Sequence, residues 1–339
     1  MKIVIRVLKY TGLLAVVLLV AGSVYQMQAS SIDRVNFPPP GELFLVDGLE
    51  MHLDCRGHGE PTVILEAGLT SGSASWGLVH DTLSEVTQIC AYDRAGMDWS
   101  EPAERVINAT TVATRLHTLL STAELKGTQI LLGMSAGGVF VREYYARFPD
   151  QVVGMVLVDS SHEQQGDRLP KIGGSDQFSR ILSLCSWLQP IGVIRGFGLL
   201  DSFLDQYELP EKMSAIARAN AYQSHTCSAM LLEADGFQNE VFDVDPPASL
   251  GTLPLSVLSQ GKAPQANAEF GLTLEDATKM AEVWDVLQNE LTALSSVGQR
   301  SIASASGHVI QLEQPQIVID KVTQMVRNYR SRQVDRRTK

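Results

Sequence analysis

The chain has 339 residues, of which 45% are hydrophobic, so it can bury one large α/β core together with an insertion. Its formal net charge of -11 argues against a nucleic-acid partner, because phosphate binding requires a basic face. The basic stretch at residues 327–339 is the exception. We interpret it as a solvated, frayed tail.

The N-terminus carries a targeting signal. Lys2, Arg6 and Lys9 precede the uncharged residues 10–25, a length that suits a signal-peptide core but is short for a full membrane span. Together with the apolar residues before it, the same stretch could serve as an uncleaved anchor. Because the positive charges lead, the rest of the chain is expected to cross the membrane. Residues 1–29 are therefore a signal peptide or a membrane anchor, and the body of the protein is exported.

The middle of the chain alternates between strands and helices. A linker is expected at residues 30–41, where three consecutive prolines disfavour both helix and central strand. Residues 42–162 then begin with a hairpin around Asp47-Gly48 and continue as alternating strands and helices. The predicted strands lie in ELFLVDG, MHLDCRG, TVILEAG, QICAYDRAG, TQILLGMS and VVGMVLVDSS.

The alternation breaks at residues 163–250, which contain several helical segments and no convincing strand. A strand-helix-strand-helix pattern resumes over residues 251–326. A helical insertion between two such units is most simply a lid over the strand ends. The pattern predicts an α/β fold with a helical lid.

The four cysteines have no CxxC spacing, so a zinc site is not expected. In an oxidising compartment an even number favours two disulfides. Pairing within each structural region would join Cys55 to Cys90 and Cys185 to Cys227. Four buried free thiols remain the alternative.

Residues 131–140, LLGMSAGGVF, place a serine among glycines at the end of an apolar run. A phosphate-binding loop of the Walker type would need a lysine followed by a hydroxyl residue, and neither is present. Gly-x-Ser-x-Gly between a strand and a helix is instead the pattern of a nucleophile elbow, which holds the serine oxygen above the sheet. The motif predicts that Ser135 is a nucleophile.

A serine hydroxyl needs a base to take its proton. Of seven histidines, His308 lies in a glycine-containing loop between the last strand and the last helix, which overhangs the strand ends. The other six lie on early strands, on helix faces or in the insertion. His308 is therefore the predicted base.

From about residue 42 to 325, the chain resembles the α/β-hydrolase superfamily, specifically its small, lidded serine hydrolases of the esterase and lipase type. The stretches that carry the resemblance are AYDRAGMDWS, GMSAGG, VVGMVLVDSS and SGHVIQLEQP. The resemblance implies a mostly parallel eight-stranded sheet with helices on both faces. It implies Ser135 as nucleophile, His308 as base, and an oxyanion hole formed by the amides of Leu69 and Ala136. Neither a metal nor a cofactor is implied.

The acid of the triad is open at this stage. The fold usually supplies it after the seventh strand, where this chain offers only Glu269 before the next helix. Asp159 ends the sixth strand, and some members of the family are similar in taking the acid from there. Asp159 is the predicted acid, with Glu269 as the alternative, and its role would be to hold the imidazole tautomer.

These features favour an exported or membrane-tethered serine hydrolase that cleaves a small-molecule or lipid-like carboxylic ester. Acyl transfer, or cofactor-free cleavage of a carbon–carbon bond on the same triad, is an alternative. A non-catalytic binding module of the same fold is another, because fold does not fix function. The apolar segment at residues 187–204 is interpreted as packing against the body, with membrane contact as the alternative.

Overall fold

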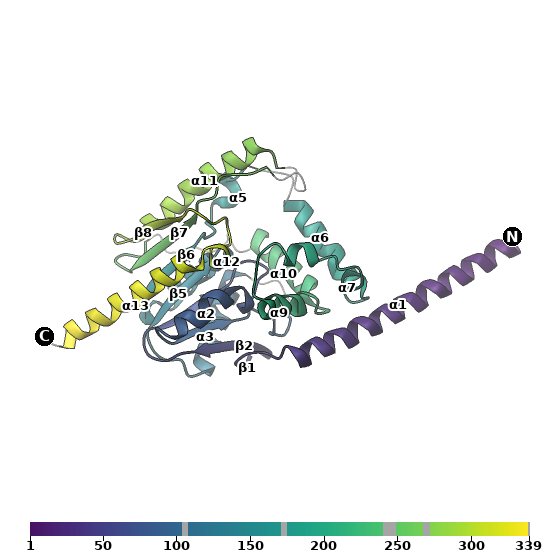
Figure 1. Cartoon of the computed structure of the whole chain (residues 1–339), viewed down its shortest axis with the longest axis horizontal. Helices are drawn as coiled ribbons and strands as arrows, with labels where there is room; N and C mark the ends of the chain where they lie inside the picture. Colours follow the sequence, from purple (N-terminus) through teal and green to yellow (C-terminus); the bar gives the residue numbers. More distant parts are fainter. Residues whose placement is uncertain (104–107, 171–174, 240–248, 267–271, 338–339) are drawn as a thin grey trace.

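The computed structural model describes residues 1–339 apart from 104–107, 171–174, 240–248, 267–271 and 338–339 (Figure 1). One eight-stranded sheet runs through the body in the order β1-β2-β4-β3-β5-β6-β7-β8. β2 pairs antiparallel with β1 and β4, and all other neighbours are parallel, so the expectation of a mostly parallel eight-stranded sheet is confirmed. The strands are β1 Glu42–Val46, β2 Leu49–Arg56, β3 Thr62–Glu66, β4 Ile89–Tyr92, β5 Gln129–Met134, β6 Val152–Val158, β7 Leu255–Gln260 and β8 Gln299–Ala303.

Helices cover both faces of the sheet, because its central strands are apolar on both sides. Successive side chains of a strand point to opposite faces, so β3 sends Ile64 into one core and Val63 and Leu65 into the other. The first core is closed by α3 Ala109–Thr122, α4 Ala136–Arg147 and α11 Leu274–Ala293. The second is closed by α2 Gly77–Ser84, which follows the short helix η1 Ser73–Trp76, and by α12 Ile310–Glu313 and α13 Pro315–Arg337. A second short helix, η2 Pro149–Gln151, leads into β6.

Between β6 and β7 the chain leaves the sheet, and we call residues 163–250 the helical insertion. Its described residues contain no strand, in agreement with the sequence pattern. The helices are α5 Gln165–Arg168, α6 Ser175–Leu188, α7 Val193–Gly196, α8 Asp201–Leu204, α9 Glu211–Ala221 and α10 Thr226–Asn239.

Both predicted disulfides are present. Cys55 is bonded to Cys90 and links β2 to β4, and Cys185 is bonded to Cys227 and links α6 to α10. The first bridge joins directly paired strands of the core. The second holds two helices of the insertion together.

Two expectations about the ends of the chain need correction. The first helix, α1 Lys2–Asn36, continues through residues 30–36, which were expected to be linker. No helix breaker occurs in this stretch before the prolines at 38–40. At the other end, α13 extends to residue 337 through the basic stretch that was expected to fray. Arg330 anchors it by donating to the carbonyls of Glu60 and Val86.

Candidate active site

The turn between β5 and α4 holds Ser135 in a strained conformation. Its φ of 51° and ψ of -121° lie in a region that non-glycine residues rarely adopt. The strain is sustained by hydrogen bonds to the neighbouring strand end. The Ser135 amide donates to the Val158 carbonyl at 3.0 Å, and the Ser135 carbonyl accepts from the amides of Gly138 (3.0 Å) and Ser161 (2.9 Å).

The glycines around Ser135 are required by close approach of the backbone. A Cβ on Gly133 would lie 2.5 Å from the carbonyl oxygen of Gly137, and one on Gly137 would lie 2.6 Å from that of Glu66. A Cβ on Gly138 would overlap the Ser160 hydroxyl. The glycine-rich pattern therefore allows α4 to pack directly against the ends of β3 and β6. It is not a cradle for phosphate.

The structure brings Ser135, His308 and Asp159 together. His308 lies between β8 and α12, and its Nε2 is 3.0 Å from the Ser135 Oγ. Its Nδ1 is 2.6 Å from the Asp159 Oδ2. The side chain of Asp159 is fully buried, whereas 42% of the His308 side chain is exposed. The histidine can thus hydrogen-bond to both partners while one face stays open to an incoming molecule.

Asp159 is fixed from three sides. Its Oδ1 accepts a hydrogen bond from the Gln260 amide at 2.9 Å and another from the Trp284 indole at 3.0 Å. The Trp284 ring also stands edge-on to the His308 ring, with centroids 6.0 Å apart. Trp284 was missed from the sequence because no motif surrounds it in α11. The alternative acid, Glu269, lies outside the described residues.

The loop after β3, residues 67–72, carries the predicted oxyanion donor Leu69 and lies beside Ser135; we call it the oxyanion loop. A Cβ on Gly68 would be 3.4 Å from the Ser135 Cβ, so the backbone that leads into Leu69 passes next to the serine. Ala136 is the first residue of α4, where an amide has no partner within the helix. Within the described residues, neither the Leu69 nor the Ala136 amide donates a hydrogen bond to another protein group.

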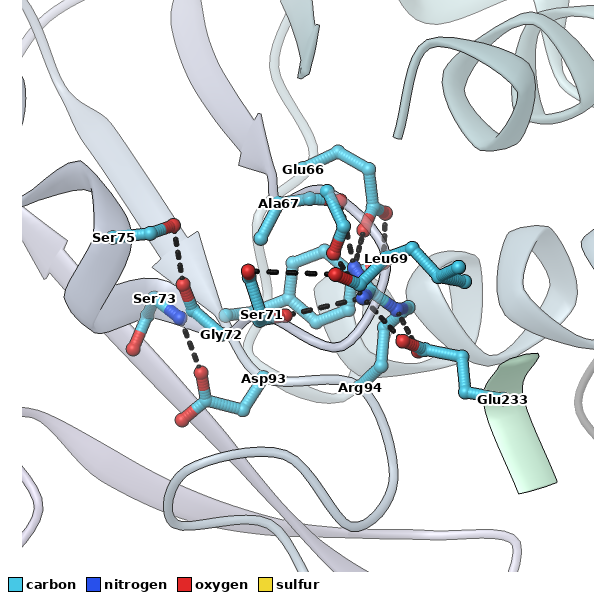
Figure 2. A network of polar contacts seen from close by, with 12 residues as sticks. Glu66, Ala67, Leu69, Ser71, Gly72, Ser73, Ser75, Asp93, Arg94 and Glu233 are labelled. Carbon is cyan, nitrogen blue, oxygen red and sulfur yellow. Dashed lines mark hydrogen bonds and ion pairs between the residues drawn. The ribbon is translucent and has the colours of Figure 1, made fainter. Parts of the chain in front are cut away.

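Arg94, which follows β4, holds the oxyanion loop through the loop's carbonyl groups. Its Nη1 donates to the Ala67 carbonyl at 2.9 Å, and its Nη2 donates to the carbonyls of Gly68 (2.7 Å) and Ser71 (3.1 Å). Figure 2 shows the guanidinium at the centre of this loop. A planar group with five donors in fixed positions is suited to holding several carbonyls at once.

Two buried carboxylates flank Arg94. Nη1 lies 2.6 Å from the Glu66 Oε1, and Nε lies 2.6 Å from the Glu233 Oε1 (Figure 2). Glu233 belongs to α10 of the insertion, and its Oε2 also accepts from the Thr70 amide of the oxyanion loop. The insertion therefore contacts the oxyanion loop through a buried charged group.

This buried cluster has two carboxylates but only one guanidinium among the groups just described, and the pKa values of several of its members are shifted. Burial raises the pKa of Glu66 to about 7, although the charge of Arg94 acts in the opposite direction. Glu66 is further bound by the Tyr92 hydroxyl, whose pKa burial and the neighbouring carboxylate raise well above its usual value. Burial lowers the pKa of Arg94, but the negative charges of Glu233 and Glu66 outweigh this effect, so the pKa is raised.

Two aspartates fix the backbone just after the oxyanion loop. Asp93 Oδ1 accepts from the Ser73 amide at 2.6 Å, and Asp98 Oδ2 accepts from the Ala74 amide at 3.0 Å (Figure 2 for Asp93). Both therefore cap the start of η1. Burial and the charge of Asp93 raise the pKa of Asp98 to about 7. Arg94 holds the carbonyls of this segment and the aspartates hold its amides, so the loop is constrained at both ends.

Comparison with known proteins agrees with this architecture. A sequence model described as the alpha/beta hydrolase fold matches residues 61–187. An "AB hydrolase superfamily protein" of Gibberella zeae is 25% identical over 288 residues, which cover 79% of this chain and 87% of that protein. A "probable transporter" of Hormonema carpetanum is 25% identical over 292 residues, 82% of this chain. The chain spans 41% of the length of the Hormonema protein and 52% of that of a further relative from Schizosaccharomyces pombe.

Among solved structures, a thermophilic esterase from Thermogutta terrifontis superimposes with a TM-score of 0.62. The two are 17% identical, and the match covers 85% of this chain and 98% of the esterase. At this identity the likeness concerns the fold. With the strand order and the elbow between β5 and α4, it shows that the chain has the α/β-hydrolase fold, and the sequence model of that fold matches residues 61–187.

Proposed function

We propose that this protein is a serine hydrolase that cleaves carboxylic esters, with Ser135 as nucleophile, His308 as base and Asp159 as the orienting acid. The observation that carries the proposal is the continuous contact from the Ser135 Oγ through the His308 imidazole to the buried Asp159 carboxylate. Groups in this order, beside the unpaired amides of Leu69 in the loop after β3 and of Ala136 at the start of α4, are what acyl transfer through a serine requires.

In the first half of the reaction, the Ser135 Oγ attacks the ester carbonyl while His308 Nε2 takes the hydroxyl proton. The negative charge that develops on the carbonyl oxygen would be stabilised by the amides of Leu69 and Ala136. The tetrahedral intermediate then collapses, and the alcohol leaves with the proton returned by His308. This leaves the acyl group on Ser135.

In the second half, His308 takes a proton from water, and the resulting hydroxide attacks the acyl-enzyme. Collapse of the second intermediate releases the carboxylic acid and returns the proton to Ser135. Asp159 keeps Nδ1 of the histidine protonated, so that Nε2 can act as the acceptor, and it stabilises the imidazolium in both halves. Trp284 and the Gln260 amide hold the carboxylate in place for this task.

We also propose that α1 tethers the enzyme to a membrane, that the body is exported, and that the helical insertion acts as a lid. α1 is long and apolar enough to cross a bilayer, with a mean hydropathy of 2.2 over its most apolar 18-residue window. Lys2, Arg6 and Lys9 precede that segment, which favours a cytoplasmic N-terminus.

Rapid mixing of the full-length protein with p-nitrophenyl esters of increasing chain length tests the proposal. We expect a burst of p-nitrophenol, followed by slower turnover, and an acyl adduct on Ser135 in the quenched sample. The Ser135→Ala protein should give neither. Turnover without an adduct on Ser135 would contradict the assignment of the nucleophile.

A further inference from the structure

The outer side of α6 to α8 in the insertion is unusually apolar. Six large side chains on these helices and their links are half or more exposed: Ile181 (50%), Leu184 (61%), Trp187 (77%), Phe197 (77%), Leu199 (54%) and Phe203 (66%). We call them the insertion patch. Scattered exposed apolar residues are normal, but six within 23 residues indicate a surface that contacts something apolar.

The charged residues of this segment do not interrupt the patch. Between residues 181 and 203 the only charged side chains are Arg195 and Asp201. Arg195 is paired with Asp33 at 2.7 Å, and Asp201 is paired with Arg218. Each of the two charges in this segment is therefore matched by an opposite one.

The opposite side of α6 is already occupied. Leu182 and Cys185 are buried, and the disulfide from Cys185 to Cys227 joins α6 to α10. Ile181, Leu184 and Trp187 are spaced three residues apart, so they share the other face of the helix. The apolar residues of the patch are thus in excess of what packing within the insertion requires.

The helix α1 docks next to this patch, as Figure 1 shows for α1 and α7. Residues 1–21 are exposed throughout, and contact with the insertion begins at Gly22. A Cβ on Gly22 would overlap the Ile191 carbonyl, and one on Gly192 would lie 2.6 Å from the Gly22 carbonyl. The α6–α7 link therefore packs directly against the α1 backbone.

Polar groups continue this contact along one face of α1. Gln26, which is fully buried, donates to the Tyr222 carbonyl at 2.7 Å, and Asp33 pairs with Arg195. The last third of α1 thus has a polar face that matches the insertion. The preceding residues 10–21 are uncharged and exposed, and Lys2, Arg6 and Lys9 lie before them. About 20 helical residues are needed to span the hydrocarbon of a bilayer, close to the length of the exposed part.

We propose that the insertion patch lies in the surface of the lipid bilayer that α1 spans. This inference rests on the membrane tether in the proposed function. The contact between Gly22 and Ile191 places the patch where α1 would leave the bilayer, since Trp187 and Phe197 flank this contact in the chain. Aromatic side chains favour the interface between headgroups and acyl chains, which suits Trp187, Phe197 and Phe203.

Fluorescence quenching in nanodiscs tests the proposal on the full-length chain. The discs are made of phosphatidylcholine that carries bromine on the acyl chain near the headgroup, with unbrominated discs as reference. We expect the brominated lipid to quench the tryptophan emission, and Trp187→Phe to lose most of that quenching. Trp284→Phe is the matched control, and it should retain the quenching of the wild type.

Equal quenching of the wild type and Trp187→Phe would overturn the proposal. The readout needs no turnover, so it separates the two proposals. Quenching through Trp187 in a protein without esterase activity would support the membrane surface and contradict the serine hydrolase. Esterase activity without quenching through Trp187 would support the serine hydrolase and contradict the membrane surface.

Discussion

The proposed nucleophile Ser135 and the proposed base His308 lie on short loops that leave the core strands, whereas the oxyanion loop is held by groups from distant parts of the chain. Ser135 is fixed by amides and carbonyls of the adjoining strand ends. The loop around Leu69 depends on Arg94 from the end of β4 and on Glu233 from α10. The core alone thus positions one half of the site, and the insertion contributes to the other.

This difference changes how the insertion should be regarded. A lid that only covered a site could be altered without effect on the catalytic geometry beneath it. Here Glu233 accepts from the Thr70 amide, next to the predicted oxyanion donor Leu69, and also binds Arg94. We therefore expect changes in the insertion to affect the chemical step as well as the binding of substrate.

The largest effect should come from the core side of the site. Ser135→Ala and His308→Ala should each lower kcat by about 10⁴-fold or more, because no other group in the site replaces either role. Steady-state ester hydrolysis measures the loss, and an unchanged Tm would show that the fold is intact. A fall of less than about tenfold in both variants would contradict the triad.

Removal of the guanidinium fork should have the next largest effect. Arg94→Lys keeps the charge but has three donors for the five groups that Arg94 binds, so we expect kcat to fall about 100-fold through displacement of the oxyanion loop. Steady-state kinetics should place most of the loss in kcat rather than KM. Arg300→Lys, on the outer strand β8, is the matched control and should be close to wild type.

Glu233→Gln tests the contribution of the insertion. The amide can accept at only one of its two positions, so either the Thr70 amide or Arg94 loses a partner. We expect kcat to fall about tenfold, as for a partly misplaced oxyanion donor. Glu211→Gln makes the same charge change on the exposed surface of α9 and should have no effect. A kcat equal to that of the control would mean that the insertion does not act on the oxyanion loop.

The smallest expected effect is on the pH dependence of the free energy of unfolding, through the ionisation of Glu66. Folding raises the pKa of Glu66 from 4.5 to about 7, so the folded state holds this proton more tightly than the unfolded state. The resulting stabilisation is complete below pH 4.5 and is lost as the pH rises through about 7, at about 1.4 kcal/mol per pKa unit. Glu66→Gln cannot ionise, so urea unfolding across this range should show a flatter decline than for the wild type. Parallel curves would contradict the raised pKa.

The sequence predicts the core side of the site because its signals are local. Most strands are bounded by turn residues, the glycines around Ser135 mark close backbone approach, and His308 follows the last strand at short distance. Both disulfides also follow from pairing within a region. Asp159 needed the resemblance to the hydrolases as well, since an aspartate that ends a strand is common.

The remaining features depend on contacts between distant segments, and no spacing in the sequence records them. Trp284 reaches Asp159 across 125 positions, and Glu233 reaches Arg94 across 139. The extension of α1 beyond residue 29 is accompanied by a contact with the insertion, because Asp33 pairs with Arg195. These are interactions that only the folded chain brings together.

The most direct test of the central claim is fluorophosphonate labelling of the full-length protein, followed by peptide mapping. The account predicts one modified residue, Ser135, with labelling lost in Ser135→Ala and strongly slowed in His308→Ala, because the imidazole must take the hydroxyl proton. Trp284→Phe, which removes one hydrogen bond to Asp159, should slow labelling to a smaller degree. Labelling of a different residue, or labelling of Ser135 at an equal rate without His308, would contradict the account.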